Sequence, residues 1–449
     1  MMLRRALVFF IALLMVFPAF AGAEEKALFR ARDEQELWGY INAKGEWVIE
    51  PQFYHATDFY KSDYAMVESG GWGFIDRNGN WAVEPHDFVD DPNFLGDVFT
   101  GGLYIIEDHE KQPDGDYVRE SMGFFDKETG YFSGMRDDWY IYPRYTESDL
   151  IPVSIYDSEN ERELLGYVNR RNGELTVPYM YDPGTDPGLF HDGVAMVYEP
   201  GELDGEGEPI GHLIDEQGNT VPLEERLRID YGTDASCGRI RVQDTVTGLY
   251  GYADTEGKLV IPAIYPGCDD FGMNRAWVSF SETESGMIDP EGNEIIRSDR
   301  IMYINIKDAE CGYALIWFTD KDDGGWITAD GRIIDKVSTG AKPAQENRFW
   351  ESAEDRYWYL TDEEGNILSG KYGLDIPNAA YFFDEGLVCV ENEDGLWGFL
   401  DENGREVIPC QFDDSAWFYG GLAEVQKDGR MAYINREGKV VWQGKVSRY

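Results

Sequence analysis

The sequence has few of the residues that build metal, redox and catalytic centres. Only 5 cysteines and 5 histidines occur among its 449 residues. The cysteines form no CxxC pair and are too scattered for a disulfide framework, and the histidines have no metal-ligand spacing. No serine lies in a G-x-S-x-G turn. We therefore predict no catalytic residue, no cofactor-binding residue and no metal-binding residue.

Positive charge is also scarce. Lys and Arg number 39 against 86 Asp and Glu, which gives a formal net charge of −47. Such a charge repels the phosphates of nucleic acids and anionic membrane surfaces, so both are excluded as partners. It suits plain solubility, or a cationic or basic partner. Long apolar runs are missing after the N-terminal segment, so we predict no membrane span.

The N-terminus has the pattern of an export signal. Arg4 and Arg5 precede an apolar run over residues 6–17, and small residues follow, with cleavage expected after residue 21 or 23. No cysteine stands at the cleavage site, which argues against a lipoprotein. We expect a signal peptide at 1–23 and an exported mature chain at 24–449, secreted, periplasmic or associated with the cell surface.

Glycine and aromatic residues are abundant, and they recur in one repeated motif. The chain has 50 glycines and 14% aromatic residues. The motif is clearest at residues 38–53 (WGYINAKGEWVIEPQF), 72–85, 250–265 and 397–412. It reads as a Trp-Gly strand (B), a tight turn that ends in glycine, and a strand rich in Val and Ile (C). A third strand (A), such as GLAEV at 421–425, precedes each B strand.

One glycine ends the B–C turn of each repeat, so the number of these glycines gives the number of repeats. These glycines are Gly45, Gly79, Gly130, Gly173, Gly218, Gly257, Gly292, Gly331, Gly365, Gly404 and Gly438. We predict an all-β fold, a tandem array of about eleven three-stranded antiparallel meander units over residues 24–449, open superhelical or propeller-like. The repeats are cleanest at 27–85 and 386–445 and degenerate between them. Both ends are whole units with no strand left over, which favours the open form.

Individual positions of the motif have expected roles. Asp401 caps the B–C turn through its carboxylate, and Gly404 supplies a positive φ. Gly398, in the middle of strand B, packs against a neighbouring backbone or ring, and Pro409 ends strand C. The tryptophans in the phase of Trp397 are assigned to the core. Aromatic residues that follow strand C are expected to anchor the connectors, namely Phe53, Tyr145, Tyr265 and Phe412.

Insertions collect between strands A and B. Residues 107–120, 157–164 and 199–209 are longer there than in other copies, whereas the B–C turns stay short. Variable loops on a rigid scaffold commonly carry binding, so we place function at the A–B edge. Aromatic residues outside the repeat phase, Trp139-Tyr140 and residues 417–419, are further candidates for ligand contact.

The motif resembles the WG-repeat family, also called KWG repeats, over nearly all of residues 27–445. Middle copies depart from it; the copy at Gly123-Phe124 lacks the tryptophan. The resemblance implies a β-rich bacterial repeat protein, usually of unassigned function, and supplies no catalytic residue.

Three functions remain open from the sequence. The leading hypothesis is an exported, non-enzymatic repeat scaffold that binds an unknown protein or glycan ligand at the cell envelope or outside the cell. The alternative is an extracellular glycan-active hydrolase that uses paired carboxylates, such as Asp269-Asp270, Asp322-Asp323 or Asp413-Asp414. The third is weak calcium binding by the acidic loop at 204–208, which lacks EF-hand spacing.

Overall fold

The computed structural model describes residues 27–59, 62–86, 102–111, 117–142, 148–184, 187–203, 207, 209–229, 232–320, 324–353, 356–374 and 382–446. The signal peptide expected at 1–23 lies outside these ranges. Within them, 40 strands and no helix are present, and the strands form ten antiparallel sheets. The all-β prediction is confirmed. The described part of the chain also offers no helix with the length and apolarity needed to span a bilayer.

The chain divides into two compact units, and the first combines residues 1–87 with residues 340–449. Its described strands form four sheets. The strands of these sheets are β1 (Leu28–Arg32), β2 (Trp38–Asn42) and β3 (Trp47–Phe53); β4 (His55–Ala56), β5 (Tyr64–Glu68), β6 (Trp72–Asp76) and β7 (Trp81–His86); β30 (Lys342–Gln345), β31 (Arg348–Ser352), β32 (Tyr357–Thr361), β33 (Tyr372–Gly373), β34 (Leu387–Glu391), β35 (Trp397–Asp401) and β36 (Glu406–Phe412); and β37 (Asp414–Tyr419), β38 (Leu422–Lys427), β39 (Arg430–Asn435) and β40 (Val440–Val446).

The second unit spans residues 88–339, and its described strands form six sheets. These strands are β8 (Leu103–Lys111), β9 (Tyr117–Asp126) and β10 (Tyr131–Phe132); β11 (Tyr140–Ile141), β12 (Leu150–Asp157), β13 (Arg162–Asn169) and β14 (Leu175–Tyr181); β15 (Val194–Leu203), β16 (Pro209–Asp215) and β17 (Thr220–Val221); β18 (Leu227–Arg228), β19 (Ile240–Asp244), β20 (Tyr250–Ala253) and β21 (Leu259–Tyr265); β22 (Gly267–Cys268), β23 (Ala276–Ser279), β24 (Ser285–Ile288) and β25 (Glu294–Ser298); and β26 (Ile301–Glu310), β27 (Tyr313–Phe318), β28 (Gly324–Thr328) and β29 (Ile333–Ile334).

Each sheet contains the expected A-B-C meander, and most sheets add one strand to it. In the sheet β4-β5-β6-β7, strands A, B and C are β5, β6 and β7, and the short strand β4 pairs with β5. The three-strand prediction therefore omits a strand in most of the described sheets. That strand is often only two residues long, so it has no alternating pattern of its own to detect. The sheet β30 to β36 joins strands of two successive copies through β33.

The B–C turn has the predicted geometry. The Asp401 Oδ1 atom accepts hydrogen bonds from the backbone N–H groups of Asn403 at 2.9 Å and Arg405 at 3.0 Å. Gly404 has a φ of 73°, and all eleven turn glycines lie between 71° and 85°. Residues with a side chain rarely adopt this conformation, so these positions require glycine.

The Trp-Gly glycine faces a bulge in strand C. Trp397 pairs with Phe412 and Phe399 pairs with Ile408, so one residue of β35 opposes three residues of β36. A Cβ on Gly398 would lie 2.7 Å from the Ile408 carbonyl oxygen and 2.7 Å from the Cys410 nitrogen. The predicted packing of this glycine against a neighbouring backbone is confirmed. The same geometry corrects the role of proline, because β36 continues through Pro409 instead of ending there.

Strand B is buried on both faces because it lies between neighbouring sheets. Tyr40 packs in one apolar cluster with Ile75 of the following repeat. In the same way, Phe399 packs with Ile434 of the repeat after it. The aromatic residue two positions after the tryptophan therefore fills the core, while Trp397 itself is only half-buried at its edge. The prediction that the Trp-Gly tryptophans pack in the core is confirmed in part, because Trp38 and Trp397 pack against the core clusters but are only partly buried.

The connector anchors are partly tested. Phe53, Tyr265 and Phe412 have exposed fractions of 5% or less, as predicted for residues that hold the connectors to the core. Tyr145 lies outside the described residues.

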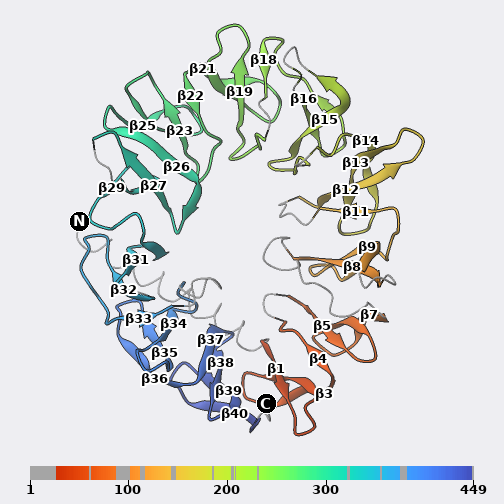
Figure 1. The fold of residues 1–449 in the computed structure, drawn as a ribbon, viewed down its shortest axis with the longest axis vertical. Coiled ribbons are helices and arrows are strands. Elements are labelled where there is room, and N and C mark those ends of the chain that lie inside the picture. The colour runs from red at the N-terminus through yellow and green to blue at the C-terminus, as the bar shows by residue number, and fades with distance from the viewer. Residues whose placement is uncertain are drawn as a thin grey trace, which may run out of the picture. The chain divides into compact units, whose positions relative to one another are not determined.

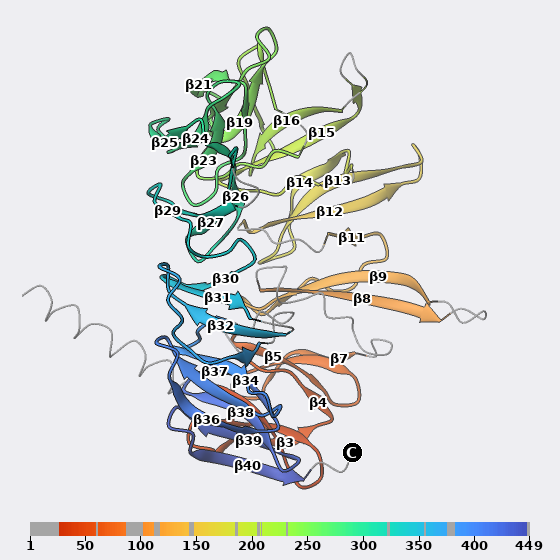
Figure 2. The ribbon, with the colours of Figure 1, turned by 60° about the vertical axis from the view of Figure 1, so that its left-hand side comes forward.

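The first and last sheets of the chain pack on each other within the first unit. Phe29 and Ile41 share an apolar cluster with Leu422 and Tyr433, and the Tyr433 hydroxyl donates to the Arg30 carbonyl oxygen at 3.0 Å. Figures 1 and 2 show β1 and β3 beside β39 and β40. We call this contact the seam.

The seam repeats the contact made between successive repeats, because Tyr433 meets Ile41 as Tyr40 meets Ile75. Each of the two sheets is built from one end of the chain, without exchange of a strand. The two terminal sheets thus pack on each other although each end of the chain is a whole unit.

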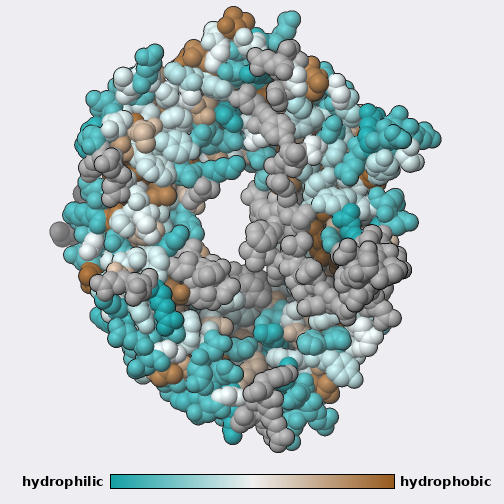
Figure 3. Space-filling view, in the orientation of Figure 1, coloured by the Kyte–Doolittle hydropathy of each residue, from teal (hydrophilic) through white to brown (hydrophobic). Residues whose placement is uncertain are grey.

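The insertions predicted as A–B loops are mostly extensions of hairpins. Strands β8 and β9 pair as far as Lys111 and Tyr117, and β12 and β13 pair as far as Asp157 and Arg162. Figure 2 shows β8 and β9 as a long two-stranded ribbon. On the face shown in Figure 3, hydrophilic residues cover most of the coloured surface, in keeping with the strongly acidic composition.

Candidate functional site

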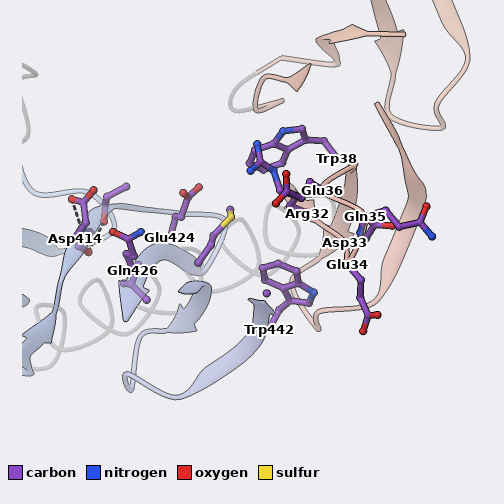
Figure 4. Close-up of a pocket in the computed structure, with 15 residues that line it drawn as sticks. Arg32, Asp33, Glu34, Gln35, Glu36, Trp38, Asp414, Glu424, Gln426 and Trp442 are labelled. Atoms are coloured by element: carbon purple, nitrogen blue, oxygen red, sulfur yellow. Dashed lines mark hydrogen bonds between the residues drawn. The ribbon is translucent and has the colours of Figure 1, made fainter. Parts of the chain in front are cut away.

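A pocket of about 780 Å³ opens at the seam, inside the first unit. The first repeat contributes the end of β1, the turn over residues 33–37 and the start of β2. The last repeat contributes residues of β37, β38, β39 and β40. In Figure 4, Arg32, Glu36 and Trp38 lie across the pocket from Glu424 and Gln426. This is the A–B edge of both repeats, where we expect binding, although none of the three insertions takes part.

The turn over residues 33–37 is a tight A–B turn with an acidic rim. Asp33 Oδ1 accepts hydrogen bonds from the N–H groups of Gln35 at 2.8 Å and Leu37 at 2.9 Å. Glu36 has a φ of 67° in this turn, whereas Gly395 has the equivalent conformation in a later A–B turn. A left-handed conformation costs a residue with a side chain about 1–2 kcal/mol. The first repeat therefore keeps a carboxylate at a position where glycine would be less strained.

An arginine stacks on the tryptophan at the pocket wall. The Arg32 guanidinium carbon lies 4.5 Å from the centroid of the Trp38 ring, and that of Arg30 lies at 5.2 Å. The Arg32 Nε atom has no hydrogen-bond partner within the described part of the chain. Stacking of this kind fixes the half-buried indole in place.

Glu424 connects the pocket to the polar part of the seam. Its Oε2 atom lies 3.2 Å from the Tyr433 hydroxyl and 3.9 Å from Arg30 Nη2. Burial raises the pKa of the Glu424 carboxyl, and the nearby Arg30 charge only partly opposes this effect. Arg30 also pairs with Asp58, at 3.3 Å from Nε to Oδ2. Arg30 thus pairs with two carboxylates, those of Asp58 and Glu424, and this leaves an excess of negative charge beside the pocket.

The pocket is acidic and aromatic. Five of its lining residues are acidic and one is basic, and Trp38 and Trp442 supply indole walls. Trp442 is held edge to face against Trp47, with ring centroids 6.3 Å apart. The lining contains no histidine, cysteine or lysine. Carboxylates beside indole rings attract a cation through charge and through the ring faces.

The structure places some of the carboxylates that were proposed for a hydrolase. Asp270 binds Arg241, with Oδ1 and Nε 3.0 Å apart. Asp322 and Asp323 lie outside the described residues. Asp414 lines the seam pocket on the side of the last repeat.

Two further groups of sequence candidates are placed differently. Trp139 is only 7% exposed and stacks on Phe124 with centroids 6.3 Å apart, so it is a core residue and not a ligand candidate. Trp417 stays a candidate because it is 42% exposed. In the calcium loop, residues 204–206 and 208 lie outside the described residues.

Two of the five cysteines, Cys268 and Cys389, are buried. All five are free thiols. Burial raises the pKa of the Cys268 thiol to about 12, which suppresses the reactive thiolate form at neutral pH.

The seam pocket is not evident from the sequence because its walls come from opposite ends of the chain. Two signals were available. The first repeat ends strand A with Arg32 and follows it with an A–B turn that is acidic and lacks glycine. It also carries Phe29 and Ile41, which give it an apolar outer face where a terminal repeat ordinarily needs a polar cap.

Comparison with known proteins gives a sequence match and several weak structural likenesses. The family model described as "WG containing repeat" matches residues 38–71, 72–86, 250–281 and 397–430. No curated protein matches the chain.

Among solved structures, a eukaryotic initiation factor is 12% identical with a TM-score of 0.36, over 77% of this chain and 96% of that chain. BamB from Moraxella catarrhalis is 11% identical with a TM-score of 0.25, over 57% of this chain and 81% of that chain. Apo AztD from Citrobacter koseri is 13% identical with a TM-score of 0.24, over 77% and 94%. These scores are too low to support an argument about function.

Proposed function

The chain is a WG-repeat protein, and on this premise we propose that it is an exported, non-enzymatic scaffold that binds a basic segment of a protein partner in the seam pocket. The observation that carries this proposal is the pocket of about 780 Å³ with acidic and indole walls. Its size lies within the range of about 300–1,000 Å³ that is usual for ligand sites. Export is supported by Arg4, Arg5 and the apolar run at 6–17.

The charge of the pocket selects the partner. Glu36, Asp414 and Glu424 line the space together with Trp38 and Trp442. A lysine or arginine side chain can meet carboxylates there while it packs along an indole face. The net charge of −47 adds a long-range attraction for a basic partner and repels an acidic glycan. A protein with an exposed basic segment is therefore favoured over a glycan.

The chemistry of the pocket favours binding over catalysis. Ser415 is the one hydroxyl side chain of the lining, and no histidine or lysine lines the pocket to activate it. Glu424 is engaged by Tyr433 and Arg30. A scaffold that binds without turnover needs only the fixed walls that the seam provides.

The test measures binding of a lysine- and arginine-rich peptide to the full-length protein by calorimetry. We expect the double variant Glu36→Gln with Asp414→Asn to weaken binding about tenfold, since exposed ion pairs contribute about 0.2–1 kcal/mol each and 1.4 kcal/mol is a factor of ten. Binding to the parent should also weaken as salt is raised, because salt screens exposed charges.

The matched control is Glu393→Gln with Asp394→Asn. These residues form the equivalent acidic A–B turn between β34 and β35, outside the pocket. This control removes the same charge and should keep the parent affinity. Equal losses in both double variants would mean that the overall charge, and not the pocket, attracts the peptide. Unchanged binding in both would reject the seam pocket as the site.

A further inference from the structure

A second site lies in the other unit, at a hairpin that the proposed function does not use. We propose that Glu199, Glu202 and His212 bind a divalent transition-metal ion of the zinc type. A donor atom from each of the three side chains lies within 4.8 Å of the donors from the other two. The site is independent of the seam pocket, so either proposal can fail without the other.

A bulge in the hairpin brings these side chains together. Tyr198 of β15 pairs with Gly211 of β16, and the next pair is Leu203 with Pro209. Residues 199–202 therefore oppose a single residue of β16. Gly201 has a φ of 80°, which allows this segment of β15 to turn out of the regular ladder. Glu199 and Glu202 stand at the two ends of the bulge, beside His212.

The donor atoms are already close to the spacing that zinc requires. His212 Nε2 lies 2.7 Å from Glu202 Oε2. Zinc bonds to nitrogen and oxygen of about 2.0–2.2 Å place tetrahedral ligands about 3.3 Å apart. Both glutamates are exposed and His212 is half-buried, so their side chains have room to reach this spacing. Within the described residues, no lysine or arginine forms an ion pair with either glutamate to compete with a metal.

The imidazole nitrogen of His212 indicates which class of metal ion the site would bind. Calcium takes six to eight oxygen ligands, whereas zinc accepts imidazole nitrogen and carboxylate oxygen in a four-coordinate site. Three protein ligands leave one position for water. The site thus differs in ion and in residues from weak calcium binding by the loop at 204–208.

The experiment titrates Zn²⁺ into the full-length protein without an affinity tag, followed by calorimetry. The variants are His212→Ala, Glu199→Gln and Glu202→Gln. The matched control is His55→Ala, because His55 faces one carboxylate, Glu68, at 3.7 Å and belongs to no three-ligand group among the residues that the structure describes. Co²⁺ serves as a second probe, since its visible absorption reports a four-coordinate nitrogen and oxygen site.

We expect saturable binding of one Zn²⁺ per chain at these residues. Each of the three variants should weaken it by roughly 100-fold or more, because even groups behind the ligands contribute about 10–100-fold. The control should keep the parent affinity.

Three results would overturn the proposal. The first is weak association without saturation, which is mere attraction of cations to an acidic protein. The second is an equal loss of binding in His55→Ala, and the third is binding that survives both His212→Ala and Glu202→Gln. Thermal unfolding of each metal-free variant checks that the protein still folds. If His212→Ala does not fold, Glu202→Gln still tests the site, because it keeps the size of the side chain.

Discussion

The glycine of the Trp-Gly pair gives the sharpest test of the repeat geometry. A Cβ on Gly398 would lie 2.7 Å from both Ile408 O and Cys410 N, and ordinary contact begins at 3.4 Å. Gly398→Ala must therefore move β36 by about 0.7 Å or distort β35. Overpacking of this kind costs about 1–3 kcal/mol, and the stiffer unfolded chain returns about 0.4–1 kcal/mol. We expect a net loss of about 1.3 kcal/mol, which lowers the melting temperature by about 3–5 °C for a unit of this size.

The matched control for this variant is Gly370→Ala in the same unit. Gly370 also has no positive φ, but an added Cβ would meet its nearest neighbour, an atom of Tyr372, at 3.6 Å. Calorimetric melting should therefore show little change or a slight gain for the control. Hydrogen exchange should locate the loss in Gly398→Ala at β35 and β36. Equal melting temperatures for the two variants would refute the explanation that Gly398 is needed because it faces the bulge in β36.

The local parts of the repeat were predictable because they depend on neighbouring residues. Asp401 caps its own turn, Gly404 has the positive φ that the turn demands, and Gly398 meets the backbone of the next strand. Each effect acts within about ten residues and recurs in several copies. The repeats of this one chain can therefore be compared with one another, and positions that recur among them show which residues the turn and the strands require.

Features that depend on the shape of the sheet were not predictable in the same way. Pro409 lies within β36 because the bulge removes the need for its missing N–H, and the sequence shows only that a proline follows Val-Ile. A tryptophan recurs at the position of Trp397 in several repeats, as a core residue would. Recurrence alone does not tell whether Trp397 or Phe399 points into the core. Phe399 takes that place, and Trp397 packs partly buried at the edge of the core.

The candidate sites escaped sequence analysis because their residues are brought together by tertiary pairing. Arg30 and Tyr433 are 403 positions apart and meet at the seam. His212 and Glu202 are only 10 positions apart, but a bulge, not a motif spacing, joins them. The apolar outer face of the first repeat, with Phe29 and Ile41, is the sequence signal that the terminal sheets pack together.

Two further predictions test the seam and the turns. Phe29→Ala should cost about 3–5 kcal/mol and speed hydrogen exchange in β39, because Phe29 packs on the last sheet; unchanged exchange there would contradict the seam. The second concerns four turn aspartates whose pKa is lowered. Partial burial raises the pKa of each carboxyl, but hydrogen bonds from the asparagine four residues later and from backbone N–H groups lower it by more. They are Asp76, Asp215, Asp289 and Asp362. Their folded pKa lies below the ordinary 3.8, so their stabilisation is complete above pH 3.8 and is lost as the pH falls through the folded value. Changing all four to Asn should keep the turns, as Asn42 and Asn435 do in other copies, and should flatten the fall in melting temperature as the pH drops below about 4. An unchanged pH profile would show that these carboxylates stabilise the turns no better than a neutral amide does.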